Sequence, residues 1–424
     1  MLAVWRVVRC LMFSPQTWPF PIDLLPADVY LVGGTVRDRL LNRQASYLDL
    51  DFVLPEKAVE TAASIARACH AGCVVLDAQR AIARVVFDQA TADFAQQQGD
   101  SLEADLQRRD FTMNAIAYHP HQQRLIDPLG GQTDIADKTI RMVSYNNLRA
   151  DPLRLMRAYR QAAQLGFTVA PDTQAAIGAL APQLRQVAIE RIRHELDKIL
   201  MTPAGDGQLQ AIFHHQLLQF CLPHFNLASL AQIAAITQAV HHFEQVLPSY
   251  AIQLHHWPRP MPPGADRSWI KTVKLSQLLG PSLAIAQAQL TALKYSRYEA
   301  QAVLTLLRVQ PTIAALCQGA LTRAQQFFLF KAAGEYFPAV SLLALAQGAE
   351  MTALQSMIER FLDPNDDIAH AQALITGTAL MQQLNIAPGP EIGRWLQAVE
   401  QAQAEGKLHS PEDAIAWVKL QKRT

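Results

Sequence analysis

The sequence predicts an α+β protein in which a mixed sheet flanked by helices comes first and an all-helical region follows. Two observations predict this order. In the first third of the chain, short apolar runs with the strand period are separated by glycine turns and helical stretches. From Leu148 onward nearly all of the apolar pattern has the helical period. A chain of 424 residues is long enough for about two to four domains.

The composition is that of a globular protein with balanced charge. There are 37 basic and 37 acidic residues, and 50% of all residues are apolar. Zero net charge argues against a protein coated with nucleic acid but permits a local basic stripe. Five cysteines form no metal-binding pattern and leave one over, which favours a reducing compartment. A membrane span needs about 20 consecutive apolar residues, and no stretch of this chain approaches that length. We therefore expect a cytoplasmic protein without a membrane partner. The oligomeric state stays open.

A strand, a glycine turn and a helix form the first informative stretch. The apolar run 29–32 ends at Gly33 and Gly34, and a helix is expected at 36–41. Two glycines let the backbone turn tightly and leave N–H groups free at the start of the helix, where a phosphate can bind. On its own, such a glycine pair is more often only a turn.

Two aspartates lie two residues apart on the next predicted strand. The strand period places the carboxylates of Asp49 and Asp51 on one face and Leu50 in the core. Adjacent oxygen ligands suit Mg²⁺, which usually takes one or two protein carboxylates together with substrate phosphates. The pattern predicts Asp49 and Asp51 as metal ligands, with an exposed sheet edge as the alternative.

The order of these features resembles a known family. The segment 31–38 (Leu-Val-Gly-Gly-Thr-Val-Arg-Asp), followed by Asp49-Leu-Asp51, is similar to the class II tRNA nucleotidyltransferases and bacterial poly(A) polymerases. The resemblance implies a nucleotidyltransferase head in which Gly33, Gly34 and Arg37 cradle the triphosphate of a nucleotide.

The resemblance also implies a third catalytic carboxylate beside Asp49 and Asp51. Asp93 is the candidate, because it lies in the β-rich run 91–95 that follows two other β-rich runs. The alternative is a solvent-facing strand residue.

The densest polar cluster lies at 105–117. Its Arg-Arg-Asp-Phe-Thr-x-Asn-Ala sequence resembles the second motif of the family. In the family this motif holds the ribose and the phosphates. The resemblance therefore implies that Asp110 accepts a hydrogen bond from the ribose 2′-OH, that Arg108 and Arg109 supply positive charge, and that Asn114 orients the site. A solvated helix start is the alternative.

A helix is predicted at 152–165, with Asp151 as its cap and Gly166 as its stop. Arg154, Arg157 and Arg160 recur every third residue and give it a basic edge, which is often only a solvated face. The segment resembles the family's Glu-Asp-x-x-Arg motif, whose Asp and Arg bind the edge of the incoming base. This implies that Asp151 and Arg154 read the base, although the family's Glu is Ala150 here.

Two further segments resemble motifs with structural roles. At 125–134, Asp127 is expected to brace a turn made by Pro128 and two glycines. At 188–200 an amphipathic helix is expected, with Ile192 and Leu196 on its apolar face and Glu195 on the polar face; it either buttresses the base pocket or only packs.

The resemblance implies an enzyme that adds CMP and AMP, from CTP and ATP, to the 3′ end of tRNA with Mg²⁺ as cofactor. Alternatives are an enzyme that adds only the two cytidines, a poly(A) polymerase and a non-catalytic RNA-binding paralogue. We expect five parts in order: an N-terminal extension, a nucleotidyltransferase head, a helical neck with the base-recognition motif, a helical body and a tRNA-binding tail. Their expected ranges are 1–20, 21–146, 147–205, 206–345 and 346–424. Met12, within the extension, is the expected true start of the protein.

The connection between Asp93 and Arg108 bears on the choice between these activities. In relatives that build all of CCA, a flexible loop at this place is thought to help the pocket switch from C to A. Here much of the connection, 101–107, reads as a helix capped by Ser101. Only about six residues remain as loop, which favours addition of the two cytidines alone.

Overall fold

The computed structural model describes residues 17–43, 47–258, 267–384 and 387–422. Most of the predicted extension 1–20, Met12 included, lies outside the described residues. The chain divides into two compact units, Met1–Ala188 with His214–Leu217, and Ile189–Phe213 with Leu218–Thr424. The finer division into head, neck, body and tail stays a prediction.

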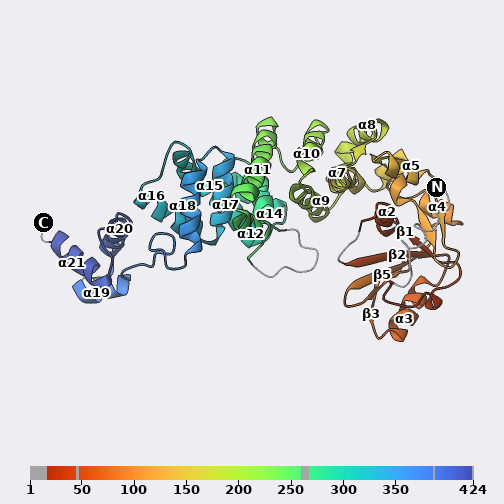
Figure 1. Ribbon diagram of the computed structural model, residues 1–424, viewed down its shortest axis with the longest axis horizontal. Coiled ribbons are helices and arrows are strands. Elements are labelled where there is room, and N and C mark those ends of the chain that lie inside the picture. The colour runs from red at the N-terminus through yellow and green to blue at the C-terminus, as the bar shows by residue number, and fades with distance from the viewer. Residues whose placement is uncertain (1–16, 44–46, 259–266, 385–386, 423–424) are drawn as a thin grey trace. The chain divides into compact units, whose positions relative to one another are not determined.

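The first unit contains a seven-stranded mixed sheet (Figure 1). Only β2 and β5 pair in parallel, and all other neighbours are antiparallel. The strand order is β3-β4-β5-β2-β1-β6-β7. The strands are β1 Tyr30–Val32, β2 Leu48–Leu54, β3 Gly72–Asp77, β4 Ile82–Val86, β5 Ala90–Gln96, β6 Ala117–His119 and β7 Arg124–Ile126. The predicted mixed sheet is thus confirmed, with β2 and β5 at its centre.

Side chains alternate along β2 and β5 between the buried core and the face of the sheet that carries the aspartates. Leu50 and Phe94 are fully buried, whereas Asp49 is exposed and Asp51 half-buried. Helix α3 (Ala58–Ala68) packs against β3, β4 and β5, and α2 (Gly34–Leu40) packs against β1 and β2 (Figure 1). The apolar positions of the strands therefore face the core, as their period predicts.

Short helices complete the first unit: α4 Leu102–Leu106, α5 Gly131–Ala136, α6 Tyr145–Ala150, α7 Leu153–Leu165 and α8 Pro171–Leu180, with 3₁₀ turns at Ile22–Leu24, Thr112–Asn114 and Ala181–Gln186. Ser101 caps α4 as predicted, since its hydroxyl accepts a hydrogen bond from the Ala104 N–H at 3.2 Å. A two-stranded parallel sheet, β8 (Thr139–Ile140) with β9 (Thr168–Val169), was not predicted. Strands of two residues carry too little periodicity to be seen in a sequence.

Asp127 braces the turn before α5, as predicted. Its two carboxylate oxygens accept hydrogen bonds from the N–H groups of Gly131 at 2.8 Å and Gln132 at 2.9 Å. A Cβ at position 131 would overlap the carbonyl oxygen of Thr112. Glycine is therefore required where α5 packs closely against the 3₁₀ turn Thr112–Asn114.

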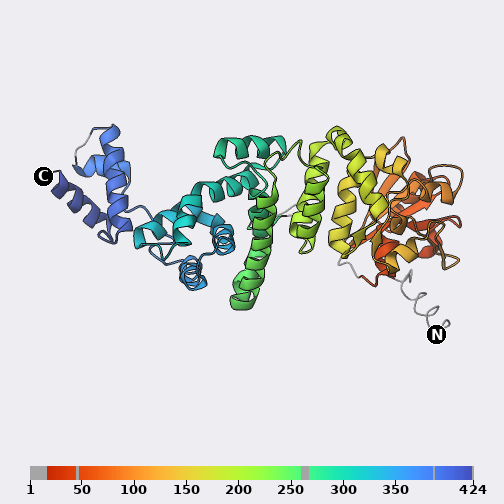
Figure 2. The same ribbon diagram turned by 90° about the horizontal axis from the view of Figure 1, so that it is seen from above.

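Helices are the only regular secondary structure among the described residues of the second unit. Helix α11 is 20 residues long and is the long green helix of Figure 2. The helices are α9 Ile189–Met201, α10 Gly205–His214, α11 Leu227–Val246, α12 Pro248–His255, α13 Trp269–Ser276, α14 Leu283–Ala292, α15 Arg297–Leu316, α16 Arg323–Ala333, α17 Phe337–Ala346, α18 Met351–Leu362, α19 Gly377–Leu384, α20 Pro390–Ala404 and α21 Pro411–Gln421. The predicted change from a mixed sheet to an all-helical region is confirmed.

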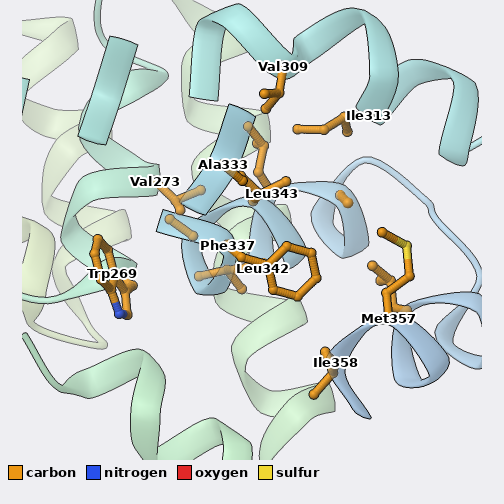
Figure 3. Packing of buried hydrophobic residues seen from close by; sticks show 14 of the residues in the cluster. Trp269, Val273, Val309, Ile313, Ala333, Phe337, Leu342, Leu343, Met357 and Ile358 are labelled. Atoms are coloured by element: carbon orange, nitrogen blue, oxygen red, sulfur yellow. The ribbon is translucent and has the colours of Figure 1, made fainter. Parts of the chain in front are cut away.

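Two separate hydrophobic clusters lie among the described residues of the helical unit. The larger one lies between α11, α12, α13, α15, α16, α17 and α18. In Figure 3, Phe337 and Leu343 lie in the middle of the labelled side chains, with Trp269 to one side and Met357 to the other. The smaller one joins α19, α20 and α21 through Leu380, Val399 and Val418.

The stretch Arg323–Ala346 is long and apolar enough to cross a membrane by length and composition alone. It is made of α16, a 3₁₀ turn at Gly334–Tyr336 and α17. Within its most apolar 18 residues, 61% are buried, and Phe337 and Leu343 lie inside the larger cluster (Figure 3). The stretch is therefore a core element of the helical unit, and its apolar side chains serve packing.

The face assigned to Glu195 on α9 was predicted wrongly. Ile192 and Leu196 are buried as expected, but Glu195 is only 5% exposed and Asp197 only 8%. Lys271 of α13 lies against α9, with its Nζ 3.4 Å from Asp197 Oδ2 and 2.9 Å from Glu299 Oε1. A buried carboxylate requires polar partners. For Asp197 the partner comes from another helix, which the pattern of a single segment cannot reveal.

Candidate active site

Three carboxylates lie together at the centre of the sheet. Asp49 and Asp51 are on the same side of β2, and Asp93 of β5 is the direct neighbour of Asp51 in the parallel register. Burial, followed by the charges of Asp49 and Asp93, raises the pKa of Asp51 to about 7. The sequence prediction that these aspartates lie side by side is confirmed.

The crowding of carboxylates fits a divalent cation. Like charges held together in a partly buried place are unfavourable, and a bound cation would relieve this repulsion. Within the described part of the chain, no three side chains of the types His, Cys, Asp and Glu are arranged to hold a metal ion by themselves. Asp49 and Asp51 therefore suit an ion that draws its other ligands from substrate phosphates and water.

Asp93 is engaged by an arginine of the neighbouring strand. Arg84 of β4 lies opposite Asp93 in the antiparallel register. Its Nε donates to Asp93 Oδ1 at 2.6 Å and its Nη2 donates to Oδ2 at 2.7 Å. Both oxygens of Asp93 are thus held in a two-pronged ion pair, the strongest geometry for this pair of groups.

The glycine turn between β1 and α2 lies beside these carboxylates. Gly33 has a φ of 76°, in the region that favours glycine. A Cβ at this position would lie 3.4 Å from Nη1 of Arg109 and 3.4 Å from Oδ2 of Asp51. The Thr35 hydroxyl donates to the carbonyl oxygen of Asp49 and so ties α2 to β2. Of the predicted phosphate-binding groups, Gly33 and Arg109 are the ones beside the aspartate pair.

Arg37, by contrast, belongs to a hydrogen-bonded network inside the unit. Its Nη1 donates to Oδ1 of Asn114 at 2.8 Å and to Oε1 of Gln161 at 3.2 Å, and its Nε donates to Asp38 at 2.9 Å. Asn114 in turn donates through Nδ2 to Gln161 at 3.0 Å. The network joins α2, the turn Thr112–Asn114 and α7, so Arg37 holds these elements together.

Asp110 continues this network on the other side of Asn114. Its Oδ1 accepts from Nδ2 of Asn114 at 2.9 Å and from the N–H of Phe111 at 2.8 Å. Its Oδ2 accepts from Nε and Nη2 of Arg157 at 3.0 and 2.7 Å. Burial alone would raise the pKa of Asp110, but Arg157, Asn114 and the Phe111 amide hold it at about 2. The group is a buried, fully bonded carboxylate, and its contact with a ribose stays a prediction.

The predicted base readers lie side by side at the start of α7. The Arg154 Nε is 4.0 Å from Oδ2 of Asp151, and its Nη1 donates to the carbonyl oxygens of Arg108 and Asn147 at 3.0 and 3.2 Å. Asp151 Oδ1 accepts from the Leu153 N–H at 3.3 Å. The structure starts α7 at Leu153 and places Pro152 at its N-cap, one residue later than predicted. Asp151 still bonds the first turn, as a capping residue does.

The remaining predicted arginines lie at the edge of this group. Arg108 is exposed, and Arg160 donates through Nη1 to Oε1 of Gln164 at 2.6 Å. Arg109 donates to Asp105 at 3.2 Å, while its Nε is buried without a hydrogen-bond partner in the structure. An unsatisfied buried donor beside the aspartate pair fits a place where an anionic ligand arrives.

Sequence reasoning missed three residues of this site. Thr91 donates to Oδ1 of Asp49 at 2.6 Å, Arg84 holds Asp93, and Gln161 joins Arg37 to Asn114. Gln161 is 124 residues from Arg37 in the chain, so nothing local in the sequence connects them. For Arg84 and Thr91, alternation along their strands would have been a usable signal once the strand register was known.

Comparisons with known proteins agree with this geometry. A family model described as the poly A polymerase head domain matches residues 29–141, and one for a probable RNA and SrmB-binding site of polymerase A matches 166–228. A putative tRNA nucleotidyltransferase domain 2 matches 268–418. The head-domain match covers Asp49, Asp51, Asp93 and Asp110, and the class follows: the chain is an enzyme, a nucleotidyltransferase.

Individual relatives give the family. A CC-adding tRNA nucleotidyltransferase from Synechocystis sp. is 42% identical over 404 residues, which cover 95% of this chain and 95% of that protein. An A-adding tRNA nucleotidyltransferase from Deinococcus radiodurans is 31% identical over 94% of this chain and 96% of that protein. This chain belongs to the tRNA nucleotidyltransferase and poly(A) polymerase family.

A solved structure shares the fold along the whole chain. The structure of a CCA-adding enzyme in complex with ATP matches with a TM-score of 0.70 at 19% identity, covering 100% of this chain and 96% of that one. The predicted order of a mixed-sheet head and a helical remainder is therefore the order found in this family.

Proposed function

We propose that this enzyme transfers CMP from CTP to the 3′ end of tRNA, and that it stops after two cytidines. The connection between β5 and α4 carries this proposal. It consists of residues 97–101 only, because β5 ends at Gln96 and α4 begins at Leu102. The CC-adding name of the Synechocystis relative, which matches along nearly the whole chain, supports the same activity.

The short connection is also tied down by hydrogen bonds. The Gln97 N–H donates to the carbonyl oxygen of Leu54 at 2.7 Å, and the Gln98 N–H donates to Oδ1 of Asp105 at 3.0 Å. Backbone groups bonded to both β2 and α4 leave this segment little freedom to move. A pocket that must be reshaped to accept adenine needs a mobile part at this place, and residues 97–101 do not supply one.

The carboxylate pair supports Mg²⁺ as the cofactor, with Asp49 and Asp51 as its protein ligands. When bound, Mg²⁺ makes the 3′-hydroxyl of the RNA more acidic and offsets the charge of the phosphates. Arg109, beside Gly33 and Asp51, would orient the triphosphate. The 3′-hydroxyl gives up its proton to water as its oxygen attacks the α-phosphorus in line; a new P–O bond forms, and the bond to pyrophosphate breaks as pyrophosphate leaves.

Base choice is assigned to Asp151 and Arg154. A carboxylate accepts from the amino group of cytosine, and a guanidinium donates to the ring nitrogen and the carbonyl oxygen of the same edge. The network from Arg37 through Asn114 and Asp110 to Arg157 supports this assignment, because it fixes the helix that carries Arg154 to the helix that follows the glycine turn. The proposal also places the enzyme in the cytoplasm, and the described cysteines are free thiols.

Single-nucleotide incorporation tests this function. Three forms of one tRNA, ending at the discriminator base, at the first C and at the second C, are each given labelled CTP or ATP alone. We expect CTP to be incorporated into the first two forms, and ATP to give no product with the third. Asp51→Asn serves as the control without transfer. Efficient ATP incorporation into the tRNA that ends in CC would contradict the proposal.

A further inference from the structure

A row of charged side chains crosses three neighbouring strands of the sheet. Arg84 of β4 lies opposite Asp93 of β5, and Asp93 lies opposite Asp51 of β2. Neighbouring strands are only about 4.8 Å apart. A carboxylate at position 93 that was free to turn could therefore reach an ion held by Asp51.

Arg84 prevents Asp93 from turning in this way. The ion pair uses both oxygens of Asp93, at 2.6 and 2.7 Å, and the Asp93 side chain is only 17% exposed. The hydrogen bond to Asp93 raises the pKa of Arg84 above its ordinary value, although burial opposes this. Lys in place of Arg could not hold both oxygens, since an ammonium group lacks the planar fork of a guanidinium.

We propose that Arg84 is a positioning residue that withholds Asp93 from the metal site, so that the catalytic ion has two protein carboxylates instead of three. This inference rests on the proposed function of Asp49 and Asp51. Each further anionic ligand binds a cation more tightly but leaves it less able to polarise the hydroxyl and phosphate oxygens that it contacts. Arg84 thereby leaves coordination positions open for the RNA and the nucleotide.

Binding of Mn²⁺ alone, followed by the electron paramagnetic resonance signal of the free ion, tests the proposal without turnover. In Arg84→Lys the positive charge remains but one oxygen of Asp93 is released. We expect Mn²⁺ to bind roughly fivefold more tightly or better, because a third carboxylate reaches the ion. In Arg84→Lys with Asp93→Asn this gain should disappear.

A matched control separates position from charge. Arg80 lies in the turn before the same strand, is largely exposed and pairs with Asp77 at 3.8 Å. Arg80→Lys should leave Mn²⁺ binding unchanged. Catalysis gives an independent measure. Arg84→Lys should lower kcat for CMP transfer, because a third carboxylate weakens polarisation by the ion, and should raise KM for CTP, because that carboxylate takes a coordination position from the nucleotide.

Two results would overturn the role of Arg84. If Mn²⁺ affinity of Arg84→Lys stays within about twofold of the wild type, Asp93 is not being withheld. If the affinity falls, the ion pair supports the site and does not restrict it. A different outcome is that Asp51→Asn still binds Mn²⁺ as the wild type does. That result would contradict Asp51 as a metal ligand, and with it the proposed function, whatever the role of Arg84.

Discussion

At the scale of single residues, the aspartate pair could be predicted because its chemistry is local. Asp49 and Asp51 share one face of β2 by the strand period, and Leu50 between them is fully buried. Arg84 could not be predicted in the same way, because its role depends on the register of β4 against β5. The residue types along one strand can be read from the sequence. A partner on the neighbouring strand can be identified only when the register between the two strands is known.

Base selectivity gives a prediction at this scale. Asp151→Ala or Arg154→Ala should reduce the preference for CTP over UTP about tenfold, because a lost directional hydrogen bond is worth about 1–3 kcal/mol in discrimination. Competition between labelled CTP and UTP on the tRNA that ends at the discriminator base measures this preference.

An exposed arginine on the preceding helix provides the control for this experiment. Arg149 lies near the end of α6 and its side chain faces solvent, so Arg149→Ala should keep the wild-type preference. If Asp151→Ala and Arg154→Ala both lower the rate but leave the CTP preference intact, these two residues only stabilise the start of α7.

At the scale of elements, α9, α13 and α15 are joined by buried charge. Lys271 of α13 contacts Asp197 of α9 at 3.4 Å and Glu299 of α15 at 2.9 Å, and it is itself 1% exposed. The sequence predicts α9 from its apolar period, but it predicts Glu195 on the wrong face. A helical pattern determines which face is apolar and cannot determine which charged residues are buried with a partner.

This cluster makes the stability of the protein depend on pH. Burial raises the pKa of Glu299, but Lys271, Ser296 and Arg267 outweigh burial and lower it from 4.5 to about 2. A carboxylate with a lowered folded-state pKa stabilises the fold above its unfolded-state value of 4.5, and this contribution is lost as the pH falls towards 2. Asp197 has the opposite sign, because burial raises its pKa.

Comparison of variants isolates the contribution of Glu299. Glu299→Gln should lower the free energy of unfolding at pH 7 by about 3 kcal/mol, and the difference from the wild type should shrink at pH 3. Urea unfolding at the two pH values measures this. Glu350→Gln, at an exposed N-cap without a side-chain cap bond, is the control. An equal destabilisation of Glu299→Gln at both pH values would show that lost packing, and not charge, is responsible.

At the scale of the whole molecule, the order of a mixed sheet and an all-helical remainder follows from the change of period near Leu148. The packing of the helices does not follow from it. Trp269, Phe337 and Met357 belong to one cluster (Figure 3) although they come from α13, α17 and α18. Such contacts depend on the lengths of the loops and on the crossing angles between helices. The apolar pattern of a single helix determines neither of these.

We propose that the enzyme adds two cytidines and no adenosine, since the segment 97–101 is short and its backbone is bonded to both β2 and α4. The most direct test is to incubate a tRNA that ends at the discriminator base with CTP and ATP together and to sequence the 3′ ends of the products. We expect the products to stop at CC even when ATP is in excess. Products that extend efficiently to CCA with this protein alone would contradict it.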